Sequence, residues 1–290
     1  MQNFADKLIN EIKEKGNPCM VGLDPRLDHI PNFINKESTS TALFEYNKII
    51  IDSIYDLVPV IKIQFAFYIE HGVEGVEAFK NTILYAKEKG LLVVIDSKSN
   101  DIGSTAEAYA NAFIGSTFDA DAVTVTPYLG SDGIMPFVKI CKEKGKGIFI
   151  LVKTSNKSSG DFQDKILKDT DKEMYESVAS MVNSLGSDLI GESGYSSIGA
   201  VVGATYPEQA KVLRKLMPKA LFLVPGYGAQ GGTAMSTLPC FNDDMFGAVI
   251  HSSRGIIFTN NLDISKEDYS KFVRENTEKM IADIKSVLNN

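Results

Sequence analysis

Residues 91–101 read Leu-Leu-Val-Val-Ile-Asp-Ser-Lys-Ser-Asn-Asp, so an apolar run passes directly into a cluster of charged and polar side chains. The apolar part, residues 91–95, has the length and the branched side chains of a strand that is buried on both faces. Seven further runs of this kind are found at residues 19–23, 58–65, 122–126, 147–152, 198–202, 221–224 and 247–251.

The segments between these runs have the spacing of amphipathic helices. Leu43, Tyr46, Ile50 and Ile54, for example, lie about one helical turn apart. Eight buried strands that alternate with helices predict an α/β protein of the (β/α)₈ TIM-barrel class, and 290 residues is a typical length for one such domain, spanning 1–290. A doubly wound open sheet is the alternative fold, but no GxGxxG motif follows the first run. An additional helix at residues 4–15 precedes the first strand, where it is expected to cover the barrel floor.

Composition argues against several classes of partner. The formal net charge is −7 and the pI is about 5.1, so no general attraction to nucleic acid or to an anionic membrane is expected. The apolar runs are much shorter than a membrane span, and the amino terminus lacks the pattern of a secretory signal. Cys19, Cys141 and Cys240 are widely separated, which suggests neither disulfides nor a thiolate metal site. A cytoplasmic location is therefore expected.

The charged cluster after the third strand is the strongest candidate for chemistry. Side chains alternate along a strand, so Asp96 and Lys98 are expected on the same side at the barrel mouth, with Asp101 close by. Lys62 stands among apolar residues of the second strand, and a buried ammonium is costly unless it is paired. An ordinary solvated ion pair would explain Asp96 and Lys98 alone. The position of Lys62 favours a functional charge network instead.

Two loops near the carboxyl end of the chain suggest a phosphate site. Loops after the seventh and eighth strands commonly bind phosphate in TIM barrels, because glycines allow backbone N–H groups to approach an anion and arginine can bind two of its oxygens. A plain tight turn is the alternative. The candidate phosphate-binding residues are Pro225, Gly228, Gln230 and Gly231 in residues 225–232, and Ser253 and Arg254 after the eighth strand.

Further polar residues follow the first and fifth strands. Asp24 could accept hydrogen bonds from a sugar or a base, and Thr154, Ser155 and Asn156 suit a planar heterocycle, although loop capping explains the latter three about equally well. The histidines are dispersed, and no metal-binding, nucleophile-elbow or Walker motif is present. No metal and no cofactor are therefore expected.

These elements together resemble the orotidine 5'-monophosphate decarboxylase family, in particular its longer bacterial branch. The resemblance covers residues 21–258, nearly the whole chain. The matching segments are VGLDP, VIKIQFAFYIE, VIDSKSNDIGSTA, VTVTPYLGSDGIMPF, LVKTSN, GAVVGATYP, LVPGYGAQGG and SSRGI. One departure is Ser99, where this branch often has arginine.

The resemblance implies a cofactor-free enzyme that converts orotidine 5'-monophosphate to UMP and CO₂ in pyrimidine biosynthesis. It assigns the charge network to Lys62, Asp96, Lys98 and Asp101, with Lys98 stabilising and protonating the C6 carbanion. It also implies a homodimer in which Asp101 and Thr105 reach the partner's site. The implied ligand contacts are Asp24 to the ribose, Ser155 to the pyrimidine, and Gln230 with Arg254 to the phosphate.

Two other functions remain open at this level. A Mg²⁺-dependent sugar-phosphate decarboxylase or synthase shares a D-x-K-x-x-D element, and its activity would be lost on chelation of the metal. A catalytically inactive sensor of phosphorylated ligands would bind UMP tightly without turnover.

Overall fold

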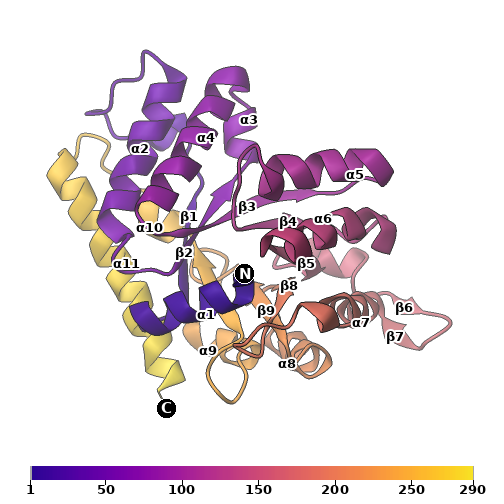
Figure 1. The fold of residues 1–290 in the computed structure, drawn as a ribbon. Coiled ribbons are helices and arrows are strands. Elements are labelled where there is room, and N and C mark those ends of the chain that lie inside the picture. Colours follow the sequence, from indigo (N-terminus) through magenta and orange to yellow (C-terminus); the bar gives the residue numbers. More distant parts are fainter. Residues whose placement is uncertain (1, 290) are drawn as a thin grey trace.

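Eight parallel strands close into a barrel in the computed structural model, which describes residues 2–289 (Figure 1). Hydrogen bonds join them in the order β1-β10-β9-β8-β5-β4-β3-β2. The barrel strands are β1 Cys19–Leu23, β2 Val60–Gln64, β3 Leu92–Ser99, β4 Ala122–Val125, β5 Gly147–Lys153, β8 Ser196–Val202, β9 Ala220–Val224 and β10 Ala248–Ser252. β6 (Ile166–Leu167) and β7 (Lys172–Glu173) form a separate antiparallel hairpin. The predicted TIM barrel is confirmed.

Helices surround the barrel, as the amphipathic segments predicted. The longer ones are α2 Thr39–Ile54, α4 Gly72–Glu88, α5 Gly103–Ala110, α6 Ser131–Lys144, α7 Met174–Gly186, α8 Pro207–Leu216 and α11 Lys266–Leu288. The short ones are α3 Ala66–Ile69, α9 Ala234–Thr237 and α10 Arg254–Ile257. A π-helical turn, Asn111–Gly115, follows α5, and 3₁₀ turns cover Leu27–His29, Lys157–Asp161, Ser187–Leu189 and Leu238–Cys240. Within residues 2–289, none of the helices combines the length and the apolar character needed to cross a membrane.

Seven of the eight barrel strands end at the rim within one residue of their predicted ranges, and the third strand differs most. The third was expected to end at Ile95, but β3 continues through the charged cluster to Ser99, with a register shift against β4 between Ile95 and Ser99. The second strand ends at Gln64, because Phe65 has the dihedral angles of a helical residue and directly precedes α3. The larger difference, in β3, occurs where polar side chains replace the apolar pattern on which the range was based.

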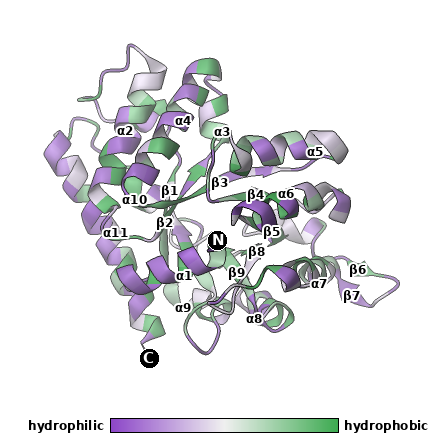
Figure 2. Ribbon diagram, viewed as in Figure 1, coloured by the Kyte–Doolittle hydropathy of each residue, from purple (hydrophilic) through white to green (hydrophobic). Residues whose placement is uncertain are grey.

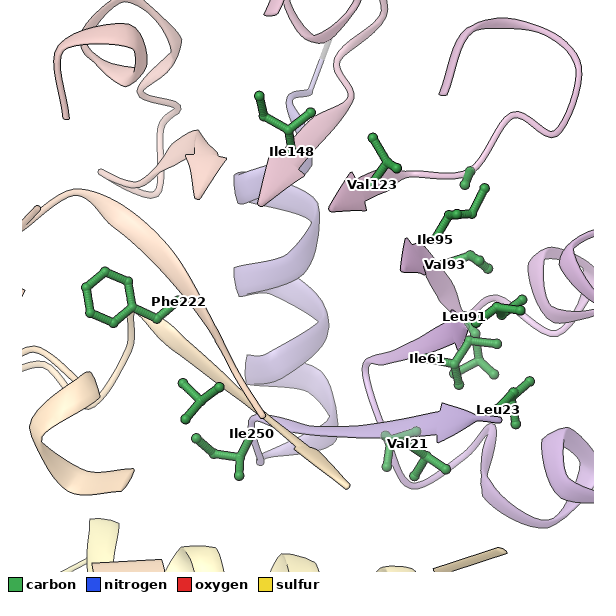
Figure 3. Close-up of a cluster of buried hydrophobic side chains, with 14 of the residues drawn as sticks. Val21, Leu23, Ile61, Leu91, Val93, Ile95, Val123, Ile148, Phe222 and Ile250 are labelled. Atoms are coloured by element: carbon green, nitrogen blue, oxygen red, sulfur yellow. The ribbon is translucent and has the colours of Figure 1, made fainter. Parts of the chain in front are cut away.

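Alternation along the strands produces two hydrophobic cores. Outward side chains such as Val21, Ile61 and Val123 pack beneath the helices, and Figure 3 shows several of them pointing away from the ring of strands. Inward side chains such as Met20 and Phe149 form the second core inside the barrel. Figure 2 agrees with this layering, since the helices carry both hydrophobic and hydrophilic residues around mostly hydrophobic strands.

The first helix closes the bottom of the barrel. α1 spans Phe4–Lys15, the predicted range, and crosses the strands in Figure 1. The Asn3 side chain caps its first turn, and Gly16 ends it in the left-handed conformation. The Phe4 ring packs edge-on against Phe149 at 5.8 Å between centroids. A methyl group on Gly147 would lie 2.2 Å from that ring, so glycine is needed for the close fit. Because α1 closes this end, a functional site is expected at the opposite end of the barrel.

Candidate active site

A continuous chain of charges lies at the carboxyl ends of β2 and β3. The Asp96 carboxylate contacts the Lys98 ammonium at 2.6 Å through Oδ1 and the Lys62 ammonium at 2.9 Å through Oδ2. It also accepts hydrogen bonds from Thr124 Oγ1 at 2.8 Å and Gln64 Nε2 at 3.1 Å. Lys62 Nζ lies 3.6 Å from Asp24 Oδ1. The predicted association of Lys62, Asp96 and Lys98 is present, and it includes Asp24.

Burial and charge act in opposite directions on this network. Burial alone would raise the pKa of Asp96, but the ammonium groups of Lys62 and Lys98 outweigh it and hold the pKa well below its usual range. Burial would likewise lower the pKa of Lys62, yet the carboxylates of Asp24 and Asp96 raise it above its ordinary value. Asp96 and Lys62 are therefore both charged at neutral pH. Lys62, with a side chain only 3% exposed, is held in the barrel by these two carboxylates.

The backbone at Lys98 is unusual. Lys98 has φ of 50°, in the left-handed region that non-glycine residues rarely adopt. Its N–H donates to Thr124 Oγ1 at 3.0 Å, and the same threonine donates to Asp96. Simple alternation correctly placed Lys98 beside Asp96, but the local geometry is a turn of the strand supported by Thr124. Strained conformations that neighbours maintain in this way are concentrated at functional sites.

A cavity of about 570 Å³ opens above this network. Its wall includes the predicted residues Asp24, Lys62, Asp96, Lys98, Thr154, Ser155, Asn156, Pro225 and Gln230. It also includes residues that the sequence did not single out, namely Gln64, Thr124, Leu151, Ser158, Ser159, Phe162, Gln163, Val201, Leu223 and His251. Gln64, Thr124 and His251 occupy inward positions at strand ends, so strand alternation was the signal that could have found them.

His251 lies inside the barrel next to the charge network. Burial, reinforced by the positive charge of Lys62, lowers the pKa of His251 to about 3, so the imidazole is neutral at physiological pH. A methyl group on Gly22 would lie 2.3 Å from His251 Nε2. Gly22 therefore makes room for the ring. His251 thus adds a neutral polar group to the cavity wall.

The loops after β5 and β9 meet over the cavity. The Ser155 hydroxyl donates to the side-chain oxygen of Gln230 at 2.7 Å, which joins the two loops directly. Gln163 holds the loop after β5 from within, because its side-chain oxygen accepts from Thr154 N at 3.0 Å and its nitrogen donates to Thr154 Oγ1 at 2.8 Å. The polar stretch after the fifth strand is thus an ordered wall of the cavity.

The two loops that were predicted to bind phosphate follow β9 and β10, but only two of their six predicted residues line the cavity. Gly226, Gly228 and Gly231 adopt positive φ, which explains the glycines of the β9 loop. The amides of Gly228 and Gly231 donate to carbonyls within the loop, so they stabilise the loop itself. Pro225 and Gln230 line the cavity, whereas Gly228, Gly231, Ser253 and Arg254 do not. Arg254 is exposed and begins α10, and both α9 and α10 have only 4 residues.

Asp101 and Thr105 also lie outside the cavity wall. Asp101 accepts a hydrogen bond from the N–H of Ile102 at 2.7 Å, and Thr105 is exposed on α5. The structure of one chain therefore does not bring these two residues to Lys98. In the part of the chain from residue 2 to residue 289, no group of three or more His, Cys, Asp or Glu side chains is placed to hold a metal ion.

The closed barrel and its charged cavity at the carboxyl ends of the strands define a (β/α)₈ enzyme with a site for a small polar ligand. Residues 20–262 match the model of the Orotidine 5'-phosphate decarboxylase / HUMPS family, and the chain belongs to this family.

Individual relatives agree with this assignment. The chain is 40% identical to the orotidine 5'-phosphate decarboxylase of Caldicellulosiruptor bescii, over 97% of this chain and 100% of the relative. It is 42% identical to that of Rhodopirellula baltica, over 93% of this chain and 92% of the relative. Among solved structures, the OMP decarboxylase of Leishmania donovani superposes with a TM-score of 0.79 at 29% identity, with 100% of both chains covered. The resemblance read from the sequence is confirmed.

Proposed function

We propose that this chain converts orotidine 5'-monophosphate to UMP and CO₂ in pyrimidine biosynthesis without a cofactor, and that residues 1–290 act as one catalytic domain. The observation that carries the proposal is the Lys98 ammonium, held at 2.6 Å from the buried Asp96 carboxylate beside a cavity of about 570 Å³. The Lys98 side chain is 46% exposed in this structure, and its ammonium stabilises negative charge much more strongly once a bound ligand excludes water from the site.

The reaction needs such a group because of the carbanion that forms. When the bond from C6 to the carboxylate breaks, its electron pair remains at C6 in the plane of the ring, where no π-system can delocalise it. Lys98 stabilises this charge and then transfers a proton to C6, which gives UMP and leaves a neutral amine that regains a proton from solvent. Asp96 remains ionised, because Lys62 and Lys98 hold its pKa low, and it repels the carboxylate that departs.

The loops around the cavity are proposed to bind the remainder of the nucleotide. Asp24 is proposed to hold the ribose, and Ser155, supported by Thr154 and Asn156, to hold the pyrimidine. Gln230 with Arg254 is proposed to bind the phosphate. The phosphate-site residues proposed beside them are Pro225, Gly228, Gly231 and Ser253. Phosphate binding remote from C6 can close the β5 and β9 loops and exclude water, and the contact between Ser155 and Gln230 supports this coupling.

A homodimer is proposed to complete the site, with Asp101 and Thr105 supplied by the partner. Exposed apolar side chains on the same segment support this proposal, since Ile102 and Tyr109 are 56% and 39% exposed. Mixing Lys98→Ala and Asp101→Asn subunits tests it. Each variant alone should be nearly inactive, but the mixed dimer contains one complete site and should recover activity. Verified mixed dimers without recovery would contradict a shared site.

The Mg²⁺-dependent alternative is less compatible with the charge network. Lys62 Nζ lies between Asp24 and Asp96, at 3.6 and 2.9 Å, so an ammonium already neutralises the carboxylates that a divalent cation would need. We also propose a cytoplasmic location, where Cys19, Cys141 and Cys240, all free and buried, are compatible with a reducing environment.

The decisive experiment follows the ultraviolet absorbance of orotidine 5'-monophosphate with purified protein in excess EDTA. Turnover that is unchanged by EDTA supports the proposal. Loss of turnover that Mg²⁺ restores would favour the metal-dependent alternative, and tight UMP binding without turnover would favour a sensor.

A further inference from the structure

Lys153 is a charged side chain that the proposed chemistry does not use. It is the last residue of β5 and its side chain is 0% exposed, yet it does not line the active-site cavity. Its ammonium pairs with Asp164, which belongs to the loop after β5. It also lies over the Tyr206 ring at 4.4 Å from the centroid. A buried ammonium requires such partners, so Lys153 ties the loop that follows its own strand to the segment of Tyr206.

Asp164 connects Lys153 to the cavity wall through its neighbours in sequence. Phe162 and Gln163 line the cavity, and the Gln163 amide group makes two hydrogen bonds to Thr154. The loop is packed closely at this point, since a methyl group on Gly160 would lie 2.7 Å from Asp164 Oδ2. The ion pair therefore fixes the chain one residue away from a side chain that shapes the site.

Tyr206 connects Lys153 to the other part of the same wall. The Tyr206 hydroxyl donates to the backbone carbonyl of Asn156 at 3.1 Å, and Asn156 also lines the cavity. The side chain of Thr205 donates to the carbonyl of Ser155 at 3.1 Å. Both ends of the β5 loop are thus held, one by Asp164 and the other by Tyr206 and its neighbour Thr205.

We propose that the pair of the buried Lys153 and the half-buried Asp164 is a latch that holds the β5 loop in the shape that receives the pyrimidine. Lys153 and Asp164 are positioning residues, and they act through Gln163, Asn156 and Ser155. The inference rests on the proposed function, in which this loop binds the base. Sites of this kind depend on supporting groups to keep the contacting groups within a fraction of an ångström of their productive positions.

The test compares Asp164→Asn with Asp161→Asn, a matched substitution of an exposed carboxylate on the same loop. Asp164→Asn removes the charge partner of Lys153 but keeps the side-chain shape. We expect KM for orotidine 5'-monophosphate to rise about tenfold, with kcat within about twofold, because binding contacts to the base are loosened while Lys98 is untouched. Asp161→Asn should match the wild type.

Binding measurements separate the latch from a general loss of structure. By titration calorimetry, Asp164→Asn should weaken the binding of UMP by about tenfold. The binding of ribose 5-phosphate, which lacks the base, should be unchanged. Asp164→Glu, which restores the charge, should recover part of the UMP affinity. If Asp164→Asn fails to fold, Lys153→Met provides the same comparison without leaving an unpaired buried ammonium.

Unchanged UMP affinity in a folded latch variant would overturn the inference. Equal weakening of UMP binding and ribose 5-phosphate binding would also overturn it. Failure of the proposed function has a different signature, namely a wild-type protein that does not turn over orotidine 5'-monophosphate. The two binding measurements still decide the role of the latch in that case, because they do not depend on turnover.

Discussion

Substitution of Lys62 by methionine isolates the role of the central ammonium in the charge network. Methionine preserves most of the aliphatic volume, so the main change is the loss of one buried positive charge. Lys62 Nζ lies 2.9 Å from Asp96 and 3.6 Å from Asp24. At an effective dielectric constant of about 20, these contacts correspond to roughly 6 and 5 kcal/mol of attraction before desolvation is subtracted.

The net effect is smaller, because removal of the charge also removes its desolvation penalty. Breaking a buried ion pair by deleting one partner typically destabilises a protein by about 3–5 kcal/mol, and we expect that range for Lys62→Met. Without Lys62, only Lys98 continues to lower the pKa of Asp96, so this pKa rises. Protonation then relieves the buried charge in the variant at a pH where the wild-type carboxylate is still ionised.

Urea unfolding at several pH values tests this reasoning. In the wild type, the pKa of Asp96 is lowered on folding, so its stabilisation is complete above the ordinary carboxyl value of about 3.9 and is lost as the pH falls below it. The difference in unfolding free energy between wild type and Lys62→Met should therefore narrow as the pH falls through the carboxyl range. Lys271→Met is the control, because Lys271 is 73% exposed and only 3.8 Å from Glu275. If Lys62→Met lowers the free energy of unfolding by less than about 1 kcal/mol, as expected of a surface pair, the reasoning is refuted.

Four further predictions concern the site and the barrel floor. Lys98→Ala should lower kcat by at least about 10³-fold while UMP binding remains measurable by calorimetry, and near-normal turnover would refute the assigned chemistry. Arg254→Ala should weaken UMP binding by about 1.5–3 kcal/mol but leave uridine binding unchanged, since uridine has no phosphate. Because the pKa of His251 is lowered to about 3, the wild type should lose stability as the pH falls below about 6.5, and His251→Asn should show a shallower loss in urea unfolding. Phe4→Ala should lower the free energy of unfolding by about 3–5 kcal/mol, measured in urea, with kcat unchanged while the protein is folded.

The barrel was predictable because its strands obey a simple rule. Each is buried on both faces, so each appears as a short apolar run, and the outward and inward cores both follow from alternation. The α1 helix was found from its spacing alone, with the range that the structure has. Strand ends were less accurate, because β3 continues through the charged residues to Ser99.

The site was most predictable for residues that lie on the barrel strands. Lys62, Asp96 and Lys98 fall into this class, and the structure brings them together. Gln163 does not, because it lies well inside a loop, where it bonds to Thr154 beside the pair of Lys153 and Asp164. Such a pair, 11 residues apart with one member in a loop, leaves no periodic signal in the sequence. The positions proposed for Asp101 and Thr105 depend on a second chain, so one chain does not test them.

The closed floor leaves the rim as the entrance to the barrel interior. With Phe4 seated against Gly147 and the lower interior filled by side chains, nucleotide has to arrive at the rim, and both UMP and carbon dioxide have to depart by the same route. Entry of the nucleotide and release of the products then depend on the loops that meet between Ser155 and Gln230. Release of carbon dioxide and exchange of nucleotide therefore use the same end of the barrel.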